Sequence, residues 1–273
     1  QLKTILDDIV ARKELEVAET MAAHPLTELE AELADAPPTR GFAAALRSEP
    51  GALETNVIAE IKRKSPSAGV IREDFDPVDI AKRYQDAGAK AISCLTDGPG
   101  FGGRLEYLRM VRDATSLPIL RKEFIIDPYQ VIEARVWGAD AVLLIAECLD
   151  DEMLKRCRDQ ARELGLSVLI ELHAEANLER VLELNDFAAD RELLLGINNR
   201  DLARMKTDLS RTEELLTMDV AEGLEREGVV SESGIRTPED LKDLRDCGVR
   251  IVLVGEHLMR CDDPGDALKK LLS

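Results

Sequence analysis

Charged residues stand at the ends of several short apolar runs of this sequence. Glu60 and Lys62 lie two residues apart in the run Val57–Lys62, so both side chains point to the same face if the run is a strand. Lys122 and Glu171 end two later runs. A lysine in such a position can act as a general acid or form a Schiff base, and a carboxylate there is costly unless it is paired or functional. Glu60 and Lys62, taken alone, are equally typical of a structural ion pair.

Small residues follow two apolar runs near the end of the chain. The segment Ser231–Arg236 reads SESGIR, and Gly255 follows Val254. Gly234 and Gly255 let the backbone approach a ligand closely, and backbone N–H groups in such turns commonly hold phosphate. Ordinary turns also favour Gly and Ser. Because the pattern follows both runs, it favours a phosphate site.

A short repeat indicates the elements that position these residues. Gly88, Gly138, Gly165 and Gly248 each end a helical pattern and precede an apolar run. Glycine is the expected residue just past a helix C-terminus, and such an apolar run is typical of a strand buried on both faces. The four copies predict an alternating array of strands and helices.

Further apolar runs complete a set of eight predicted strands, which are Val57–Lys62, Ala91–Thr96, Pro118–Lys122, Ala141–Ile145, Ser167–Glu171, Leu193–Asn198, Val229–Glu232 and Ile251–Val254. The amphipathic stretches between them predict helices at Pro77–Ala87, Leu105–Ala114, Pro128–Trp137, Glu152–Leu164, Ala176–Leu184 and Pro238–Asp246. Eight alternations favour an α/β protein with a closed (β/α)₈ TIM barrel. A doubly wound open sheet is the alternative, but the glycine-rich dinucleotide turn that it would carry after its first strand is missing from the sequence.

Residues before Glu49 do not follow this rhythm. A helical stripe precedes the break at Pro37 and Pro38, and it consists of Leu2, Ile5, Leu6, Ile9 and Val10. We therefore expect a single domain of residues 1–273, with 1–48 as a helical extension over one barrel end and 49–273 as the barrel. Whether the extension also touches a substrate is left open by the sequence.

In a TIM barrel the active site is built at the C-terminal ends of the strands. The residues predicted there are Glu60, Lys62, Lys122, Glu171, Asn198, Arg200, Glu232, Ser233 and Gly255. Arg121 and Lys122 alternate, so only one of them can face the mouth of the barrel. The basic, turn-rich segment 63–69 is typical of an anion-attracting lid or of a solvated loop.

The composition of the chain limits the classes of molecule that it is expected to bind. The formal net charge of −18 argues against binding to nucleic acid or an anionic membrane, so a small anionic substrate would need a local positive patch. The three histidines and five cysteines form neither an H-E-x-x-H nor a C-x-x-C pattern, which predicts no metal and reduced thiols. No signal peptide and no apolar run long enough to span a membrane is present. These observations predict a cytoplasmic protein.

Four segments together carry a family resemblance. They read AEIKRKSPS at 59–67, LRKEFIID at 120–127, INNRDL at 197–202 and VSESGI at 230–235. In this order, each at the end of a predicted strand, they resemble indole-3-glycerol-phosphate synthase, a barrel enzyme of tryptophan biosynthesis. The resemblance extends over essentially the whole chain, the helical extension included.

The resemblance implies conversion of 1-(2-carboxyphenylamino)-1-deoxyribulose 5-phosphate to indole-3-glycerol phosphate, with loss of carbon dioxide and water and without a cofactor. It implies that Lys122 is the general acid, that Glu171 is the general base of the late step, and that Lys62 contacts the substrate and is an acid in one of the two steps. Further positions orient the lysines and the sugar hydroxyls, and these are Glu60, Asn198 and Glu232, with Ser233 beside them.

The remaining positions suit substrate binding. Arg200 and Ser65 suit an anionic group, Phe101, Phe124 and Leu202 suit a wall for the aromatic ring, and Gly234 and Gly255 suit the phosphate. Some relatives carry a smaller residue where this chain has Glu256. We expect its carboxylate to point away from the phosphate, so that only its backbone N–H helps. Other enzymes of tryptophan biosynthesis are possible partners.

Two other functions fit parts of this pattern. An aldolase-type barrel would use Lys122 to form a Schiff base. A catalytically silent barrel that serves as a binding or scaffold subunit would have lost the charges at its mouth, whereas Lys62, Lys122 and Glu171 are all present. The phosphoribosylanthranilate isomerase barrel shares the phosphate region but not the Glu-x-Lys-x-x-Ser-Pro-Ser segment.

Overall fold

Eight parallel strands close into a barrel in the computed structural model, which describes residues 4–49, 51, 54–201 and 206–273. Around the barrel the order is β1-β12-β11-β8-β7-β6-β5-β4. The bounds are β1 Asn56–Ile61, β4 Ala91–Leu95, β5 Ile119–Lys122, β6 Ala141–Ile145, β7 Ser167–Leu172, β8 Leu193–Asn198, β11 Val229–Glu232 and β12 Ile251–Val254. Each predicted strand is present with ends that differ by at most one residue. The predicted closed barrel is confirmed, and the open sheet is wrong.

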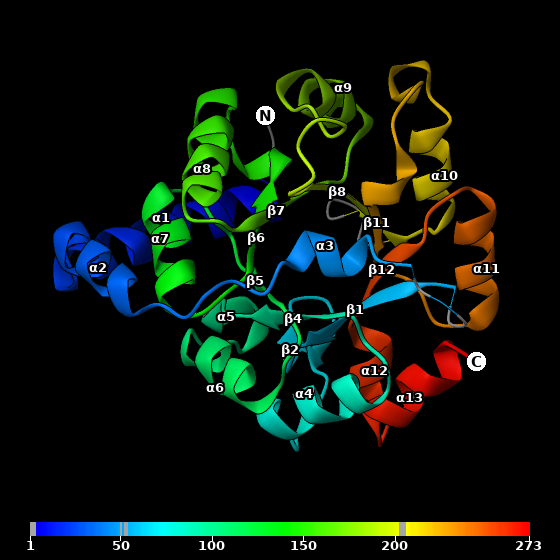
Figure 1. Ribbon diagram of the computed structural model, residues 1–273, viewed down its shortest axis with the longest axis horizontal. Helices are drawn as coiled ribbons and strands as arrows, with labels where there is room; N and C mark the ends of the chain where they lie inside the picture. Colours follow the sequence, from blue (N-terminus) through cyan, green and yellow to red (C-terminus); the bar gives the residue numbers. More distant parts are fainter. Residues whose placement is uncertain (1–3, 50, 52–53, 202–205) are drawn as a thin grey trace.

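Helices form a ring outside the strands (Figure 1). The six predicted ones are α4 Pro77–Asp86, α6 Glu106–Ala114, α7 Pro128–Val136, α8 Asp151–Glu163, α9 Glu175–Leu184 and α11 Pro238–Asp246. Three of them begin with a capping side chain followed by proline, at Asp76, Asp127 and Thr237. Helices that the sequence did not predict are α5 Gly98–Phe101, α10 Ser210–Leu216, α12 Glu256–Arg260 and α13 Pro264–Leu271.

The repeated glycines lie where the pattern placed them. Gly88, Gly138, Gly165 and Gly248 all have positive φ, between 69° and 95°, as the chain leaves one helix and enters the next strand. Side chains between the strands and the surrounding helices form the larger apolar core. A second core fills the barrel itself and includes Ile58, Leu120 and Leu169.

The chain before β1 forms α1 Ile5–Ala23, α2 Leu26–Glu32, a 3₁₀ turn Leu33–Asp35 (η1) and α3 Phe42–Leu46. Helix α3 closes the end of the barrel where the strands begin, because Phe42 is fully buried in the inner core and the Ala43 N–H donates to Ser167 Oγ at 3.1 Å.

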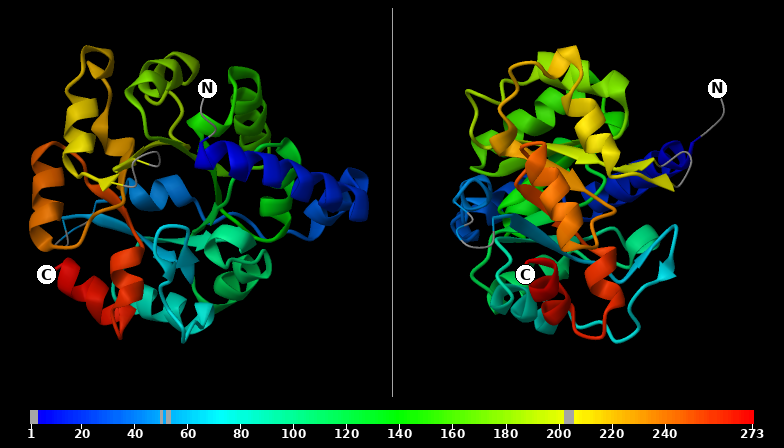
Figure 2. Two further views of the ribbon diagram at one scale, coloured as in Figure 1. Left: turned by 180° about the vertical axis from the view of Figure 1, so that it is seen from behind. Right: turned by 90° about the vertical axis from the view of Figure 1, so that its right-hand side faces the viewer.

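Helix α1 lies at the opposite end, as the turned views show (Figure 2). Lys13 Nζ lies 3.0 Å from both Asp97 and Glu123, which follow β4 and β5. The extension therefore covers the end where the strands begin, as expected, and its first helix also reaches the opposite end.

The predicted stripe of α1 is only partly buried. Ile5 is 49% exposed, Leu2 lies outside the described residues, and the buried side chains of the helix are Lys13 and Val17. A buried cation thus takes the place of the expected apolar contact, because two carboxylates at the strand ends face it. Among the described residues, no helix is both long enough and apolar enough to cross a membrane.

Candidate active site

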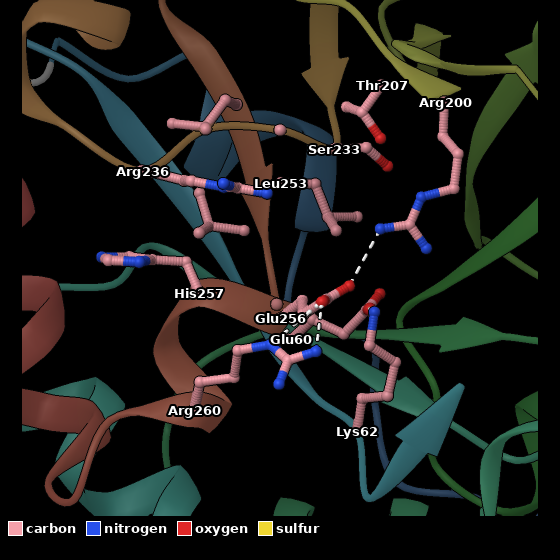
Figure 3. Close-up of a pocket in the computed structure, with 14 residues that line it drawn as sticks. Glu60, Lys62, Arg200, Thr207, Ser233, Arg236, Leu253, Glu256, His257 and Arg260 are labelled. Atoms are coloured by element: carbon pink, nitrogen blue, oxygen red, sulfur yellow. Dashed lines mark hydrogen bonds and ion pairs between the residues drawn. The ribbon is translucent and has the colours of Figure 1, made fainter. Parts of the chain in front are cut away.

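A pocket of about 370 Å³ opens beside the C-terminal ends of β1, β11 and β12 (Figure 3). Predicted site residues that line it are Glu60, Lys62, Arg200, Ser233, Gly234, Gly255 and Glu256. Parallel strands of a barrel deliver their C-terminal ends to one face, which is why residues far apart in the sequence meet here.

Lys122, at the end of β5, lies between two carboxylates at the mouth of the barrel. Its Nζ is 3.0 Å from Glu171 Oε2, at β7, and 2.7 Å from Glu232 Oε2, at β11. Arg121 points the other way and pairs with Glu133 of α7 at 2.8 Å. The prediction that only one of the two neighbours faces the mouth is confirmed.

The charges of this trio depend on one another. Burial lowers the pKa of Lys122, but Glu171, Glu232 and Glu60 together raise it above its usual value, so the amine keeps its proton. Burial raises the pKa of Glu171, yet the positive charges of Lys122 and His173 bring it below its usual value. Burial and the neighbouring Glu171 hold the pKa of Glu232 well above its usual value. The negative charge of this pair of carboxyl groups is therefore favoured on Glu171.

Glu60 and Lys62 form the ion pair that their spacing allowed. Lys62 Nζ lies 3.1 Å from Glu60 Oε1, and the Ser93 hydroxyl donates to Glu60 Oε2 at 3.0 Å. Burial raises the pKa of Glu60, but Lys62 and Lys122 more than offset this and lower it. Both residues also line the pocket, so the pair is placed to meet a ligand.

Asn198 and Ser233 connect the trio to the pocket. The Asn198 amide donates to Glu171 Oε1 at 3.2 Å, and the Ser233 hydroxyl donates to Asn198 Oδ1 at 2.8 Å. Ser233 has a φ of 71°, which is uncommon for a residue with a side chain. The turn after β11 thus holds this hydroxyl in one direction.

Two glycines leave room in the pocket wall. A Cβ on Gly234, where φ is 85°, would lie 2.6 Å from Thr207 Cγ2, and a Cβ on Gly255 would lie 2.7 Å from Glu60 Oε1. Both turns were predicted as phosphate-binding. Only glycine fits at these positions without moving a neighbour.

The carboxylate of Glu256 points in a direction that the sequence did not predict. Its Oε2 accepts a hydrogen bond from Arg200 Nη2 at 2.9 Å and its Oε1 accepts one from Arg260 Nη2 at 2.8 Å, inside the pocket (Figure 3). Burial raises the pKa of this carboxyl, but the two guanidinium groups lower it below its usual value. The carboxylate points into the pocket because two cations face it there.

Comparison with known proteins agrees with this geometry. A family model described as indole-3-glycerol phosphate synthase matches residues 6–271. Indole-3-glycerol phosphate synthase of Rhodopirellula baltica is 50% identical over 270 residues, with 99% of both chains covered. The protein of that name from Polaromonas naphthalenivorans is 46% identical, with the same coverage. The chain belongs to the indole-3-glycerol phosphate synthase family. The resemblance carried by the four sequence segments is confirmed.

Solved structures resemble the barrel at low sequence identity. The chain superposes on 3-hexulose-6-phosphate synthase from Salmonella typhimurium with a TM-score of 0.58 and 16% identity, over 80% of this chain and 96% of that one. KGPDC from Streptococcus mutans gives a TM-score of 0.57 and 15% identity, over 80% and 95%. These likenesses concern the fold alone.

Three further predicted binding residues of this member of the indole-3-glycerol phosphate synthase family, Phe101, Phe124 and Ser65, follow strands at the mouth. Phe101 of α5 and Phe124, two residues past β5, face each other with ring centroids 6.1 Å apart. Ser65 lies in a hairpin of β2 Lys64–Ser65 and β3 Gly69–Val70, where its hydroxyl accepts the Ala68 N–H. It is buried and is not part of the pocket lining. Leu202 lies outside the described residues.

Several residues at the site were missed by the sequence argument. Arg236, His257 and Arg260 line the pocket, and the two arginines add the positive charge that an anionic substrate needs on an acidic protein. Arg236 lies two residues after Gly234, so its place in the same turn was a usable signal. His173 approaches Glu171, and it follows Glu171 by two residues, the same spacing that paired Glu60 with Lys62.

Proposed function

We propose that this chain converts 1-(2-carboxyphenylamino)-1-deoxyribulose 5-phosphate to indole-3-glycerol phosphate at the barrel mouth, by general acid–base catalysis and without a cofactor. Family membership supports the reaction. The observation that supports the location most directly is the contact of Lys122 with both Glu171 and Glu232.

Ring closure is the first step. The ring carbon that bears the carboxylate attacks the carbonyl carbon of the ribulose, and Lys122 donates a proton to the carbonyl oxygen as it becomes a hydroxyl. A lysine surrounded by carboxylates stays protonated until the developing negative charge of the substrate draws the proton away. Carbon dioxide then leaves, and its electron pair returns to the ring.

Dehydration is the late step. Glu171, which is ionised, accepts a proton from the intermediate while the hydroxyl formed in the first step leaves as water with a proton from an acid. Lys62 lines the pocket, and we assign to it contact with the substrate and the role of an acid in one of the two steps. Glu60 holds Lys62, and Asn198 and Glu232 orient Glu171 and Lys122.

Substrate binding uses the pocket wall. The backbone of the turns at Gly234 and Gly255 receives the phosphate, and Ser233 lies beside it. Arg200 and Ser65 lie on the side of the anthranilate carboxylate, where that group replaces Glu256 as the partner of Arg200. The aromatic ring of the substrate packs against a second wall, which is formed by Phe101, Phe124 and Leu202.

The Schiff-base alternative is less favoured by the charges. A lysine that forms an imine needs a neutral amine, which a lowered pKa provides. The pKa of Lys122 is raised, since Glu171, Glu232 and Glu60 outweigh the effect of burial. The silent-barrel alternative is likewise less favoured, because the mouth keeps two groups of contacting charges, Lys62 with Glu60 and Lys122 with two carboxylates.

The predictions about location, partners and domains stay part of this proposal. We place the protein in the cytoplasm, and we expect no nucleic acid or membrane partner and possible contacts with other enzymes of tryptophan biosynthesis. We also retain a single domain, with 1–48 as its extension. Support for the last point comes from Phe42, which fills the inner core of the barrel.

The test is to add the carboxyphenylamino substrate and follow the fluorescence of the indole product. We expect turnover by the wild-type chain and a fall in kcat of about 10²–10⁴-fold in Glu171→Gln, since a positioned base contributes that much. Borohydride added with the substrate should leave the enzyme active. A covalent adduct on Lys122 after borohydride would favour the aldolase alternative, and absence of indole product would contradict the proposal.

A further inference from the structure

Glu147 fixes the imidazole of His173 in one orientation. This glutamate lies in the 3₁₀ turn Ala146–Cys148 (η3), directly after β6. Its Oε1 accepts hydrogen bonds from the backbone N–H of His173 at 2.8 Å, from that of Ala174 at 3.1 Å and from the Asn177 amide at 2.9 Å. Its Oε2 lies 3.2 Å from His173 Nδ1. With one oxygen held by three donors, the other has a fixed position from which it orients the ring.

The other ring nitrogen of His173 faces the proposed base. Nε2 lies 3.3 Å from Glu171 Oε1, and the histidine side chain is only 9% exposed. This contact is an ion-pair distance and not a hydrogen bond, since Nε2 has no hydrogen-bond partner within the described residues. Catalytic contacts are often long in a free enzyme and shorten when substrate binds. Nδ1 and Nε2 thus each face a carboxylate, and an imidazolium could donate to both once the longer contact shortens.

This arrangement makes the two carboxylates beside Lys122 unequal. Both accept from Nζ, at 3.0 Å for Glu171 and 2.7 Å for Glu232. Glu171 has two additional neighbours on Oε1, Asn198 and His173. Glu232 Oε1 is buried and has no hydrogen-bond partner in the part of the chain that the structure describes. Two carboxylates this close do not both ionise readily, so the one with more donors keeps the negative charge.

We propose that His173, held by Glu147, is a positioning residue that makes Glu171 rather than Glu232 the carboxylate that accepts the substrate's proton. The inference rests on the proposed function of this site. In the late step the substrate's C–H bond breaks, its proton binds Glu171, and the electron pair forms the new double bond as the C–O bond breaks and the hydroxyl leaves as water with a proton from the acid. The imidazolium keeps both of its own protons, and Glu171 returns its proton to water before the next turnover.

The charges around His173 support an imidazolium. Burial lowers its pKa, but the hydrogen bond to Glu147 and the charges of Glu171 and Glu147 together raise it. Arg211 of α10 contacts only the backbone carbonyl of His173, at 3.0 Å. The other titratable or charged groups that face His173 and Glu171 are Lys122, Glu232 and Cys148, whose thiol has a pKa raised to about 12 by burial and by the two glutamates. Among these, Lys122 is the group that opposes the imidazolium.

The first test is the pH profile of kcat in His173→Gln, which keeps a donor but loses the charge. Removing the positive charge raises the pKa of Glu171, so the acid limb of the profile should move to higher pH by about one unit. KM should stay within about twofold. Glu147→Gln should move the limb in the same direction by less, because His173 stays in place but holds its proton less firmly. The matched control is His24→Gln, since His24 pairs with Glu32 on the surface, and its profile should equal that of the wild type.

An unchanged acid limb in His173→Gln would overturn the inference. The second test needs no turnover and follows the imidazole nitrogens of His173 by NMR as the pH is changed. The pH at the midpoint of the His173 titration should fall in Glu171→Gln and in Glu147→Gln, because each change removes a negatively charged neighbour. A midpoint that stays in place in Glu171→Gln would contradict the inference even in an active enzyme, whereas a wild-type chain that fails to form the indole product would contradict the proposed function instead.

Discussion

The two ends of the barrel use buried charges in different ways. At the end where the strands begin, Asp140 precedes β6 and is fully buried. Its Oδ1 accepts from the Arg40 backbone N–H at 2.8 Å and from Arg112 Nη1 at 3.0 Å, and its Oδ2 accepts from the Ile119 N–H at 2.8 Å. Arg40 and Arg112 use their remaining donors on backbone carbonyls. This carboxylate therefore ties together parts of the chain that cannot exchange partners without unfolding.

At the mouth, Lys122 and Arg200 meet other side chains instead. Lys122 is held by the carboxylates of Glu171 and Glu232, and its side chain is 15% exposed. Arg200 likewise contacts Glu256 at the edge of the pocket. Side-chain partners can be exchanged for groups of a substrate at little cost in folding. The difference indicates that charges fixed to backbone serve the architecture, whereas charges fixed to each other beside an open pocket serve the chemistry.

The largest effect is expected from Lys122→Met. Loss of the general acid should lower kcat by about 10²–10⁴-fold with a modest change in substrate affinity. The free energy of unfolding should fall by only about 1–2 kcal/mol, because Glu171 and Glu232 can then share a proton. Product fluorescence and urea unfolding measure the two quantities. The control is Lys82→Met, at an exposed position of α4. Wild-type-like turnover in the Lys122 variant would contradict the assignment of Lys122 as the general acid.

Asp140→Ala should give the opposite pattern. Removing this carboxylate leaves Arg112 and two backbone N–H groups without their partner, so the free energy of unfolding should fall by about 3–5 kcal/mol. The kcat of the folded fraction should stay within about twofold. Urea unfolding followed by circular dichroism measures the loss, with exposed Asp113→Ala as the control. A large fall in kcat without a loss of stability would contradict the division of roles between the two ends.

A smaller effect is expected from Gly234→Val. The new Cβ would meet Thr207 in the pocket wall, and the positive φ adds strain of about 1–3 kcal/mol. Phosphate binding should suffer more than chemistry, so KM should rise by about tenfold while kcat changes less. Gly223→Val carries a similar φ of 81° in open space, which isolates the strain from the pocket. Equal KM values in the two variants would argue against a phosphate site at Gly234.

The barrel was predictable because its strands and helix ends leave local signals. Strands buried on both faces read as apolar runs, and Gly138 or Gly248 marks the point where each helix must stop. The short hairpin at Lys64–Val70 and the helix at Glu256–Arg260 were not predicted. Two-residue strands and one-turn helices show no periodicity that a sequence can reveal.

The site residues that lie at the ends of strands were predictable from the sequence. Lys122, Glu171 and Glu232 meet because β5, β7 and β11 end on one face, which follows from the fold. The direction of Glu256 was not predictable, because it depends on the side-chain conformations of Arg200 and Arg260. The burial of Lys13 in α1 was missed for a similar reason, since two of its three partners, Asp97 and Glu123, are more than eighty residues away in the chain.

The pairing of β1 with β12 joins the first strand of the barrel to its last. A chain growing on the ribosome therefore carries Glu60 and Lys62 long before it carries Gly255, the residue whose backbone completes their side of the pocket. Closure cannot occur until the final strand has been made, and folding has to wait for the most distant contact in the sequence. The pocket therefore forms only after the last strand has been synthesised. A fragment that ends before Ile251 should lack this pocket and should not bind the substrate.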